Sequence, residues 1–328
     1  MLTLPDIDQI RKAKDRLSAI RRTPLIRCDL PDLPDLPTEV YLKLENKQIT
    51  GSFKLRGAGN AVLTAASQGI RRVWTASAGN MGLGVAWYAA QCGLDCTVIV
   101  PEDAPRAKIR AIQSHGGSVV ELPRQEYWEI QVTHHRDGMA GHFIHPFADR
   151  EVMAGNGTLA LEILEDLPDV EAVIIPYGGG GLTCGVAAAL RSLQPDTKII
   201  AAETENGAPL SPSLKAGKRV EVPYWKSFVS GMGSPRVFKE MWPLLQELVH
   251  ESRVVKLAET AEAIKLLLET HHLAAEGAGA ISLAAALFGR IPGKKVVAII
   301  TGGNIDLDEI RKILNSYPQE GKPPDLSQ

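Results

Sequence analysis

Strand-like and helix-like segments alternate along this chain, with glycines at many of the turns between them. Short apolar runs bounded by turn residues predict buried strands, and longer alanine- and leucine-rich segments predict helices. The predicted strands cover residues 73–76, 96–100, 118–122, 171–176, 198–202 and 295–300. The predicted helices cover residues 83–92, 108–114 and 183–193. This alternation predicts an α/β fold with open, mostly parallel sheets flanked by helices.

The composition excludes several classes of protein. The 328 residues are enough for two modest domains, and 45% hydrophobic with 23% charged residues is ordinary for a globular protein. The net charge of −2 gives no electrostatic reason to expect nucleic acid or an anionic membrane as a partner. No apolar run reaches the roughly 18 residues of a membrane span, and the N-terminus lacks the layout of a signal peptide. We therefore expect a cytoplasmic protein.

Other groups of reactive side chains give no sign of a metal site. The cysteines show neither metal-binding nor redox spacing and are interpreted as reduced core thiols; they are Cys28, Cys92, Cys96 and Cys184. Four histidines within 12 residues match no standard zinc pattern, and we expect them on the surface and in turns; they are His134, His135, His142 and His145. Acidic residues of a helix predicted from about Thr158 are interpreted as its solvated face; they are Glu162, Glu165 and Asp166.

Lys54 is the most informative single residue. It lies in Gly51-Ser52-Phe53-Lys54-Leu55-Arg56-Gly57, where glycines, a serine and a phenylalanine predict a tight, half-apolar turn. Burial disfavours the ammonium form and lowers the pKa of a lysine, which leaves a neutral amine able to attack a carbonyl. Enzymes that use pyridoxal phosphate bind this cofactor through such a lysine. A lysine among glycines is weak support by itself, so this interpretation depends on other segments.

Four consecutive glycines, Gly178-Gly179-Gly180-Gly181, lie between a predicted strand and a predicted helix. Their backbone N–H groups are unhindered, and the following helix adds the positive end of its dipole, so the segment predicts a phosphate site. A flexible turn is the alternative, but four glycines would make such a turn entropically costly. The spacing is not that of a dinucleotide-binding loop, and no acidic residue follows the next strand until Glu203.

Two more turns carry polar side chains at the ends of predicted strands. Ser77-Ala78-Gly79-Asn80 offers a hydroxyl, an amide and the N–H groups of a helix start, which together suit a carboxylate. An ordinary helix N-cap is the alternative for this segment. Thr301 ends the last predicted strand, where open α/β sheets place ligand contacts, although the turn is also a common one.

Several segments, in order along nearly the whole chain, resemble one known family. They are Arg22-Thr23-Pro24-Leu25, Tyr41-Leu42-Lys43-Leu44-Glu45-Asn46, Thr50-Gly51-Ser52-Phe53-Lys54, Ser77 to Gly82, His145-Pro146-Phe147, Gly155-Asn156-Gly157-Thr158, Gly178 to Leu182, Glu276-Gly277-Ala278-Gly279-Ala280 and Thr301-Gly302-Gly303-Asn304. With them the chain resembles the pyridoxal-phosphate-dependent serine/threonine dehydratases, or threonine ammonia-lyases, of the tryptophan-synthase-β-like fold (fold type II). This group also contains serine racemase.

The resemblance implies an architecture and a set of site residues. Residues 1–70 and 150–328 would form a large cofactor-binding domain, residues 71–149 a small mobile domain that binds the substrate carboxylate, and two chains a homodimer. Lys54 would hold the cofactor and act as the base at the substrate α-carbon. The expected substrate-binding residues are Ser77, Ala78, Gly79 and Asn80. The expected cofactor-binding residues are Phe53 against one ring face, Lys54, Asn80 at the 3-hydroxyl, the phosphate-binding Gly178, Gly179, Gly180 and Gly181, Leu182, Glu276, and Thr301 at the pyridine nitrogen.

The implied reaction is α,β-elimination of a 3-hydroxy amino acid such as L-threonine or L-serine, which yields a 2-oxo acid and ammonia. Thr301 makes the cofactor ring a weaker electron sink than a carboxylate would, which favours prompt loss of the β-substituent over transamination. The alternatives are a bulkier substrate such as phenylserine or 3-hydroxyaspartate, another β-elimination or β-replacement reaction of the same fold, serine racemisation, and a non-catalytic protein that binds the cofactor.

The chain departs from the family pattern at several positions. Serine racemases carry a serine at the position of Ala78, and an alanine methyl cannot transfer a proton, so racemisation is not expected as the main activity. Met81 and Leu83 replace a histidine and a glutamine, which predicts a less polar carboxylate pocket. Glu203 matches one ligand of a divalent cation that some relatives bind, but Pro209 stands at the second ligand position. We therefore expect no metal site.

Overall fold

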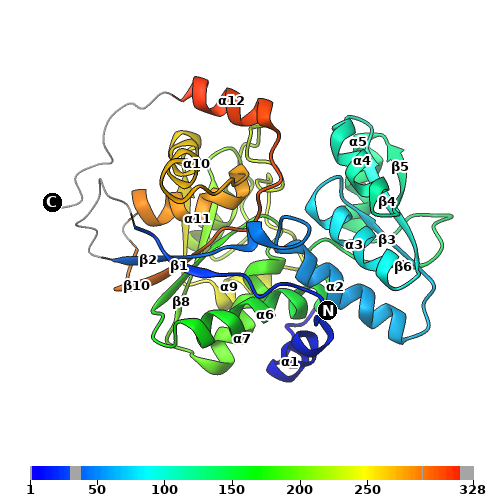
Figure 1. The fold of residues 1–328 in the computed structure, drawn as a ribbon, viewed down its shortest axis with the longest axis horizontal. Coiled ribbons are helices and arrows are strands. Elements are labelled where there is room, and N and C mark those ends of the chain that lie inside the picture. Colours follow the sequence, from blue (N-terminus) through cyan, green and yellow to red (C-terminus); the bar gives the residue numbers. More distant parts are fainter. Residues whose placement is uncertain (1, 30–37, 290, 318–328) are drawn as a thin grey trace.

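The computed structural model describes residues 2–29, 38–289 and 291–317, and in them two sheets carry helices on both faces (Figure 1). The larger sheet has six strands in the order β1-β2-β10-β7-β8-β9. They are β1 (Leu25–Arg27), β2 (Glu39–Lys43), β10 (Lys295–Ile299), β7 (Ala172–Pro176), β8 (Lys198–Thr204) and β9 (Glu251–Val255). All neighbouring strands of this sheet run parallel except β1 and β2.

The smaller sheet has four strands in the order β5-β4-β3-β6, and all of its neighbouring strands run parallel. They are β5 (Ser118–Leu122), β4 (Asp95–Pro101), β3 (Arg72–Ala76) and β6 (His142–Phe143). This sheet is built from one continuous part of the chain, whereas the larger sheet takes strands from before and after it. The predicted α/β fold with mostly parallel sheets is confirmed. The mobility predicted for residues 71–149 stays a prediction.

Helices connect the parallel strands, as parallel pairing requires. They are α1 (Ile7–Arg16), the 3₁₀ turn η1 (Glu45–Lys47), α2 (Lys54–Ser67), α3 (Asn80–Gln91), α4 (Arg106–Ser114), α5 (Arg124–Thr133), α6 (Arg150–Asp166), α7 (Gly181–Leu193), α8 (Leu210–Ala216), α9 (Trp242–Leu248), α10 (Leu257–His271), α11 (Gly277–Phe288) and α12 (Leu307–Ser316). In the described residues no helix has the length and apolarity needed to cross a membrane.

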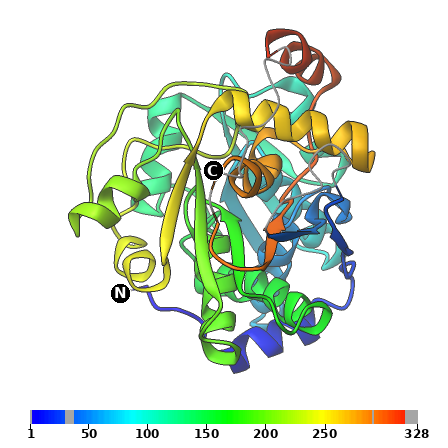
Figure 2. The same cartoon turned by 90° about the vertical axis from the view of Figure 1, so that its left-hand side faces the viewer.

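Each face of the larger sheet has its own hydrophobic core. Along β7, Val173 and Ile175 pack among α6 and α7, while Ala172 and Ile174 pack among α10 and α11. Figure 2 shows the green helix α7 and the gold and orange helices α10 and α11 on opposite sides of the strands. Because both faces are covered, β7 is buried at every position and has no polar alternation.

The predicted elements are present, but four helices begin earlier than predicted, among them the helix predicted over 108–114, which begins at Arg106. The helix expected from about Thr158 begins at Arg150, where the Asp149 carboxylate caps it by accepting hydrogen bonds from the amides of Glu151 and Val152. The glycines of this first part do not mark a loop. A Cβ at Gly155 would lie 2.3 Å from the carbonyl oxygen of Arg56, so the glycine allows α6 to pack closely against α2. The helices predicted over 83–92 and 183–193 begin at Asn80 and Gly181.

The sequence predicts that the acidic residues of α6 face solvent, but not all of them do. Glu165 and Asp166 are exposed, but Glu162 is only 7% exposed. One Glu162 oxygen lies 2.7 Å from an Arg56 guanidinium nitrogen, and the other lies 2.7 Å from Nζ of Lys43. The prediction for Glu162 is therefore wrong, because its carboxylate forms ion pairs with two buried cations, Arg56 of α2 and Lys43 of β2.

The interpretation of the cysteines is confirmed. All four are free thiols, and three of them are buried. Burial raises the pKa of the Cys28 and Cys96 thiols to about 12, so these side chains are inert core residues.

Candidate active site

The turns at the carboxyl ends of parallel strands bring the predicted residues to one edge of each sheet. Gly178 follows β7, Thr301 follows β10, and Ser77 follows β3. Open α/β sheets bind ligands at this edge. The other contacts of the site come from the Lys54 turn, from the residues around Pro146 and from the start of α11.

Lys54 is the first residue of α2, and the turn before it is held by the segment after β10. The amide of Phe53 donates a hydrogen bond to the carbonyl of Thr301 at 3.0 Å, and Ser52 pairs with Gly302 as an antiparallel bridge. The predicted lysine and the predicted threonine are therefore neighbours, although 247 positions separate them in the sequence.

The Lys54 amine donates a hydrogen bond to the carbonyl oxygen of Pro146 at 2.8 Å, and Nζ lies 5.2 Å from the ring centroid of Phe53. The side chain as a whole is half-buried, but its amine is removed from water. Burial lowers the pKa of this lysine to about 8, and the nearby Glu276 carboxylate partly opposes the shift. An amine with this pKa is partly neutral at mildly alkaline pH and can act as a nucleophile or a base.

The glycine run forms the start of α7, and close neighbours account for its glycines. Gly180 has φ of +94°, which favours glycine, and it is the N-cap of the helix. A Cβ at Gly179 would lie 2.3 Å from the Phe147 ring, and one at Gly178 would lie 2.9 Å from the carbonyl oxygen of Gly231. The first-turn N–H groups of α7 have no intrahelical acceptors and can donate to an anion.

The segment from Ser77 to Asn80 forms the turn between β3 and α3. The Gly79 amide donates a hydrogen bond to the Ser77 hydroxyl at 3.2 Å. The Asn80 side chain reaches the other sheet: its Nδ2 donates to Glu276 Oε1 at 2.7 Å, and its Oδ1 accepts a hydrogen bond from Asn304 Nδ2 at 2.8 Å.

Glu276 and Thr301 lie together next to the Lys54 turn. Glu276 is the N-cap residue of α11 and is buried. Burial raises the pKa of its carboxyl group to about 7, although the hydrogen bond from Asn80 and the charges of Lys108 and Lys54 favour the ionised form. The buried Thr301 hydroxyl donates a hydrogen bond to the carbonyl of Ala278 at 3.0 Å.

Hydrogen bonds link Phe53 with Thr301, Gly79 with Ser77, and Asn80 with Glu276. The glycine run packs against Phe147, the residue after the Pro146 carbonyl that accepts from Lys54. The Leu182 side chain packs into the hydrophobic core beside α6. Met81 is also a core residue, which gives a structural reason for its apolar character. Phe147, Gly231 and Asn304 have no role that the sequence alone indicates, although Phe147 and Asn304 lie in motifs of the resemblance.

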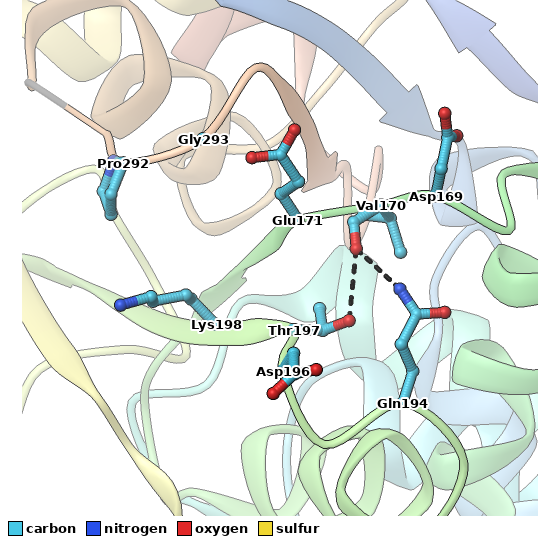
Figure 3. Close-up of a pocket in the computed structure, with 9 residues that line it drawn as sticks. All are labelled: Asp169, Val170, Glu171, Gln194, Asp196, Thr197, Lys198, Pro292 and Gly293. Atoms are coloured by element: carbon cyan, nitrogen blue, oxygen red, sulfur yellow. Dashed lines mark hydrogen bonds between the residues drawn. The ribbon is translucent and has the colours of Figure 1, made fainter.

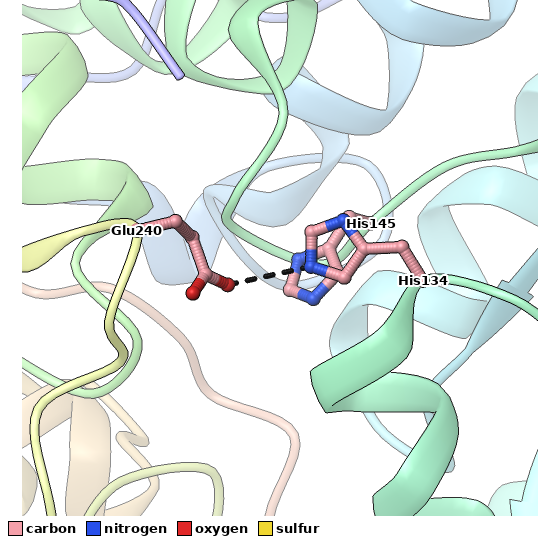
Figure 4. A group of neighbouring side chains, drawn as sticks. All are labelled: His134, His145 and Glu240. Carbon is pink, nitrogen blue, oxygen red and sulfur yellow. Dashed lines mark hydrogen bonds and ion pairs between the residues drawn. The ribbon is translucent and has the colours of Figure 1, made fainter. Parts of the chain in front are cut away.

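The expectation for the four histidines is wrong for His145, which is buried. Its ring stacks on that of His134 with a centroid distance of 4.2 Å, and His134 Nε2 lies 3.3 Å from Glu240 Oε1 (Figure 4). Three such side chains resemble a metal site. However, Nδ1 of His145 accepts hydrogen bonds from the backbone amides of Phe147 and Ala148, and its Nε2 lies 3.2 Å from the carbonyl oxygen of Gln131. Since both ring nitrogens are occupied, we interpret the group as a structural contact between the two parts of the molecule.

Glu203 also has structural partners. Its two oxygens accept hydrogen bonds from the amides of Leu210 and Ser211, and the Ser252 hydroxyl donates to one of them, each at 2.7 Å. The carboxylate therefore satisfies the amides at the start of α8.

A surface pocket of about 400 Å³ lies at the opposite, amino-terminal ends of β7, β8 and β10 (Figure 3). Its charged lining residues include Asp169, Glu171, Asp196 and Lys198, and the Gln194 and Thr197 side chains donate hydrogen bonds to the Val170 carbonyl. No predicted site residue lines it, and we assign no role to it.

Comparison with known proteins agrees with this geometry. Residues 17–302 match the family described as pyridoxal-phosphate-dependent enzyme. The chain belongs to this family. It is 38% identical to the L-threonine ammonia-lyase of Thermotoga maritima, over 96% of this chain and 79% of that protein. It is 36% identical to a catabolic L-threonine dehydratase of Staphylococcus aureus, over 96% of this chain and 92% of that protein. The structure of maize serine racemase superimposes with a TM-score of 0.86 at 30% identity, over 96% of this chain and 98% of that one.

Proposed function

We propose that this protein catalyses the pyridoxal-phosphate-dependent α,β-elimination of a 3-hydroxy amino acid, L-threonine or L-serine, to a 2-oxo acid and ammonia. The observation that carries this proposal is the environment of the Lys54 amine. Burial lowers the pKa of this amine to about 8, and the amine lies among the turns that follow β3, β7 and β10. The names of the threonine ammonia-lyase and threonine dehydratase relatives support this choice of substrate.

The residues of the site fit the cofactor. Lys54 would bind it covalently, and the N–H groups of Gly178 to Leu182 would hold its phosphate, Leu182 through its backbone alone. Phe53, Asn80, Glu276 and Thr301 would surround the ring. Close packing against Gly231 and Phe147 accounts for Gly178 and Gly179, and the phosphate assignment is supported by the N–H groups at the start of α7, which lack intrahelical acceptors. When bound, pyridoxal phosphate withdraws electrons from the substrate α-carbon and so acidifies its proton.

Protein groups would bind the substrate and remove its α-proton, and the β-hydroxyl group would take up a proton and leave as water. Ser77 and Asn80, with the N–H groups at the start of α3, would bind the substrate carboxylate. The amine of Lys54 would remove the α-proton, for which a pKa near neutrality is well suited. Closure of the part built from residues 71–149 would exclude water during these steps.

Ala78 argues against racemisation as the main activity, although the fold is also that of maize serine racemase. Inversion at the α-carbon needs a proton donor on the face opposite to Lys54, and the Ala78 methyl group cannot supply one. Lys54 on one face of the α-carbon and Ala78 on the other therefore favour elimination over racemisation. L-threonine and L-serine are the first substrates to test, and phenylserine and 3-hydroxyaspartate are the bulkier and the more acidic alternatives.

The test is the release of 2-oxo acid from L-serine, D-serine, L-threonine, 3-hydroxyaspartate and phenylserine by the pyridoxal-phosphate-loaded protein. We expect turnover of L-threonine or L-serine that is lost in Lys54→Ala. Turnover of phenylserine alone would keep the reaction and change the substrate. A protein that binds the cofactor but releases 2-oxo acid from none of the five compounds would contradict the proposal. We also propose a homodimer, which sedimentation velocity tests directly.

A further inference from the structure

A chain of side-chain amides begins at the backbone of the turn that carries Lys54. The Thr50 carbonyl accepts a hydrogen bond from Asn304 Nδ2 at 2.8 Å. The same Nδ2 group lies 2.8 Å from Asn80 Oδ1, and Asn80 Nδ2 lies 2.7 Å from Glu276 Oε1. The chain therefore joins the turn before α2, the segment after β10, the start of α3 and the start of α11.

The first member of this chain determines the orientation of the others. A backbone carbonyl can only accept hydrogen bonds, so the NH₂ group of Asn304, not its oxygen, must face Thr50. The second N–H of that group is directed at Asn80, which must then present its carbonyl oxygen. The NH₂ group of Asn80 is thereby turned toward Glu276, which takes one of its two N–H groups. One N–H of Asn80 is left for a ligand.

We propose that Asn304 is a positioning residue that fixes the Asn80 amide with one N–H group directed at the oxygen substituent of the cofactor ring. This inference rests on the proposed function, because it concerns Asn80 as a cofactor-binding residue. Asn304 itself needs no contact with the cofactor or the substrate. Its effect comes only through the orientation of Asn80.

The backbone is arranged to keep Asn304 in place. The Gly303 amide donates a hydrogen bond to the Gly51 carbonyl at 2.9 Å. Gly51 has φ of +74°, and a Cβ there would lie 2.4 Å from Asn304 Oδ1, so the asparagine packs directly on the glycine. The Asn304 side chain is exposed, so its replacement leaves the hydrophobic cores intact.

Asn304 also makes the orientation of Asn80 independent of the Glu276 proton. While Asn304 donates to Asn80 Oδ1, the carboxyl group of Glu276 must accept, whether it is ionised or protonated. Without Asn304, a protonated Glu276 can instead donate to Asn80 Oδ1 and reverse the amide. The charged groups that face Glu276 are Lys54 from α2 and Lys108 from α4. Burial raises the pKa of Glu276 to about 7, so this reversal would occur in an accessible pH range.

Two variants of the pyridoxal-phosphate-loaded protein test the proposal. Asn304→Asp keeps the size of the side chain but removes its donors, so Asn80 must turn its NH₂ group toward position 304. We expect a shifted absorbance maximum of the lysine-bound cofactor, a shifted midpoint of its pH titration, and kcat lower by about tenfold to a hundredfold, as for one lost hydrogen bond to a charged group. In Asn304→Leu we expect the absorbance spectrum of the lysine-bound cofactor to change with pH, with a midpoint near 7, which is the pKa of Glu276.

Asn46→Asp is the matched control for the added charge. Asn46 lies beside Gly303 and donates a hydrogen bond to the Ala274 carbonyl, and its side chain is not part of the hydrogen-bond chain through Asn80 and Glu276. We expect this variant to leave the absorbance maximum and the titration midpoint unchanged. Melting temperatures of all variants are measured in parallel, because loss of stability with an unchanged spectrum in Asn304→Asp would show a merely structural role and overturn the proposal.

The outcomes separate this inference from the proposed function. If the unaltered protein binds pyridoxal phosphate without visible absorbance from a lysine adduct, the proposed function fails and this inference fails with it. If the unaltered protein shows that absorbance and turnover, but Asn304→Asp has the same maximum, titration midpoint and kcat, only the inference is overturned. The same shifts in Asn46→Asp would also overturn it, because charge alone would then explain them.

Discussion

At the scale of single residues, the site depends on burial that changes the protonation of two groups. The Lys54 amine has a pKa of about 8 instead of 10.5, because its surroundings remove it from water. The Glu276 carboxyl group has a pKa of about 7 for the same reason. Each shift means that the folded protein disfavours the charged form of that group. The two groups lie near enough to oppose each other's shift, so their protonation is coupled.

The destabilising contribution of Lys54 to the cofactor-free protein should therefore shrink as the pH rises past 8. Between pH 8 and 10.5, Lys54 binds its proton in the unfolded chain but not in the folded one, so its own contribution to the free energy of unfolding becomes more favourable with pH, whereas the buried Cys28 and Cys96 thiols act in the opposite direction. Below pH 8 the folded protein bears the full free-energy cost of burying the charged Lys54 amine, and Lys54→Met removes this cost. We expect this variant to melt at a higher temperature than the parent at pH 7, by about 1–2 °C for each kcal/mol gained in a chain of this length.

Calorimetry of both cofactor-free proteins from pH 7 to 10 measures this effect. The difference in melting temperature should shrink as the pH approaches 10. Lys12→Met is the control, since Lys12 is exposed on α1. A Lys54→Met protein that melts below the parent at pH 7 would show that the amine is not a source of instability.

At the scale of elements, a buried ionic network holds together the segments around the Lys54 turn. Arg56 of α2 contacts Glu45 of η1 through two hydrogen bonds of 2.8 Å, and Glu162 of α6 through two of 2.7 and 3.0 Å. Lys43 of β2 lies 2.7 Å from Glu162 and donates to the carbonyl of Thr23. Because Arg56 and Lys54 are two positions apart, they leave the helix on different sides, and the network fixes the side of α2 away from the site.

Glu162→Gln and Glu165→Gln make a matched pair on α6. The first removes a buried negative charge from two buried cations, which typically costs about 3–5 kcal/mol of unfolding free energy. The second removes an exposed charge that pairs with Lys14 and Arg22, which is worth about 1 kcal/mol or less. Urea denaturation of the two variants at pH 7 should show this difference. Equal losses would mean that the buried network adds little stability.

The local pattern was sufficient to predict six strands of the two sheets and four helices, because those buried segments show bounding turns, but it did not predict β1, β2, β6 and β9. It was not sufficient for Glu162 or His145. The burial of Glu162 depends on Arg56 and Lys43, which lie more than 100 positions away, and no local pattern records that partnership. The burial of the Lys54 amine in a tight turn was predictable because its neighbours in the sequence also form that turn. The position of Asn304 beside Asn80 was not, because it follows from the pairing of Gly303 with Gly51.

At the scale of the whole molecule, the parts built around the two sheets touch through α5 and the segment before α9. His134, at the end of α5, lies 3.3 Å from Glu240. The ring of Phe238 lies 5.9 Å from that of Trp128 on α5 and 4.5 Å from that of Phe147 beside the glycine run. These contacts lie next to Pro146, the hydrogen-bond acceptor of Lys54, so they link the relative position of the two parts to the site.

Glu240→Ala should loosen this contact without affecting the core of either part. We expect faster hydrogen exchange of the amides of α5 with unchanged exchange in α10, and a KM raised several-fold with a smaller change in kcat, because less of the free protein then has the two parts in contact. Glu247→Ala is the matched control, since Glu247 on α9 pairs at 2.6 Å with Arg191 of α7, within the larger part. If both variants changed exchange in α5 equally, or if KM stayed constant in Glu240→Ala, the contact through α5 would not govern how the two parts come together on the substrate.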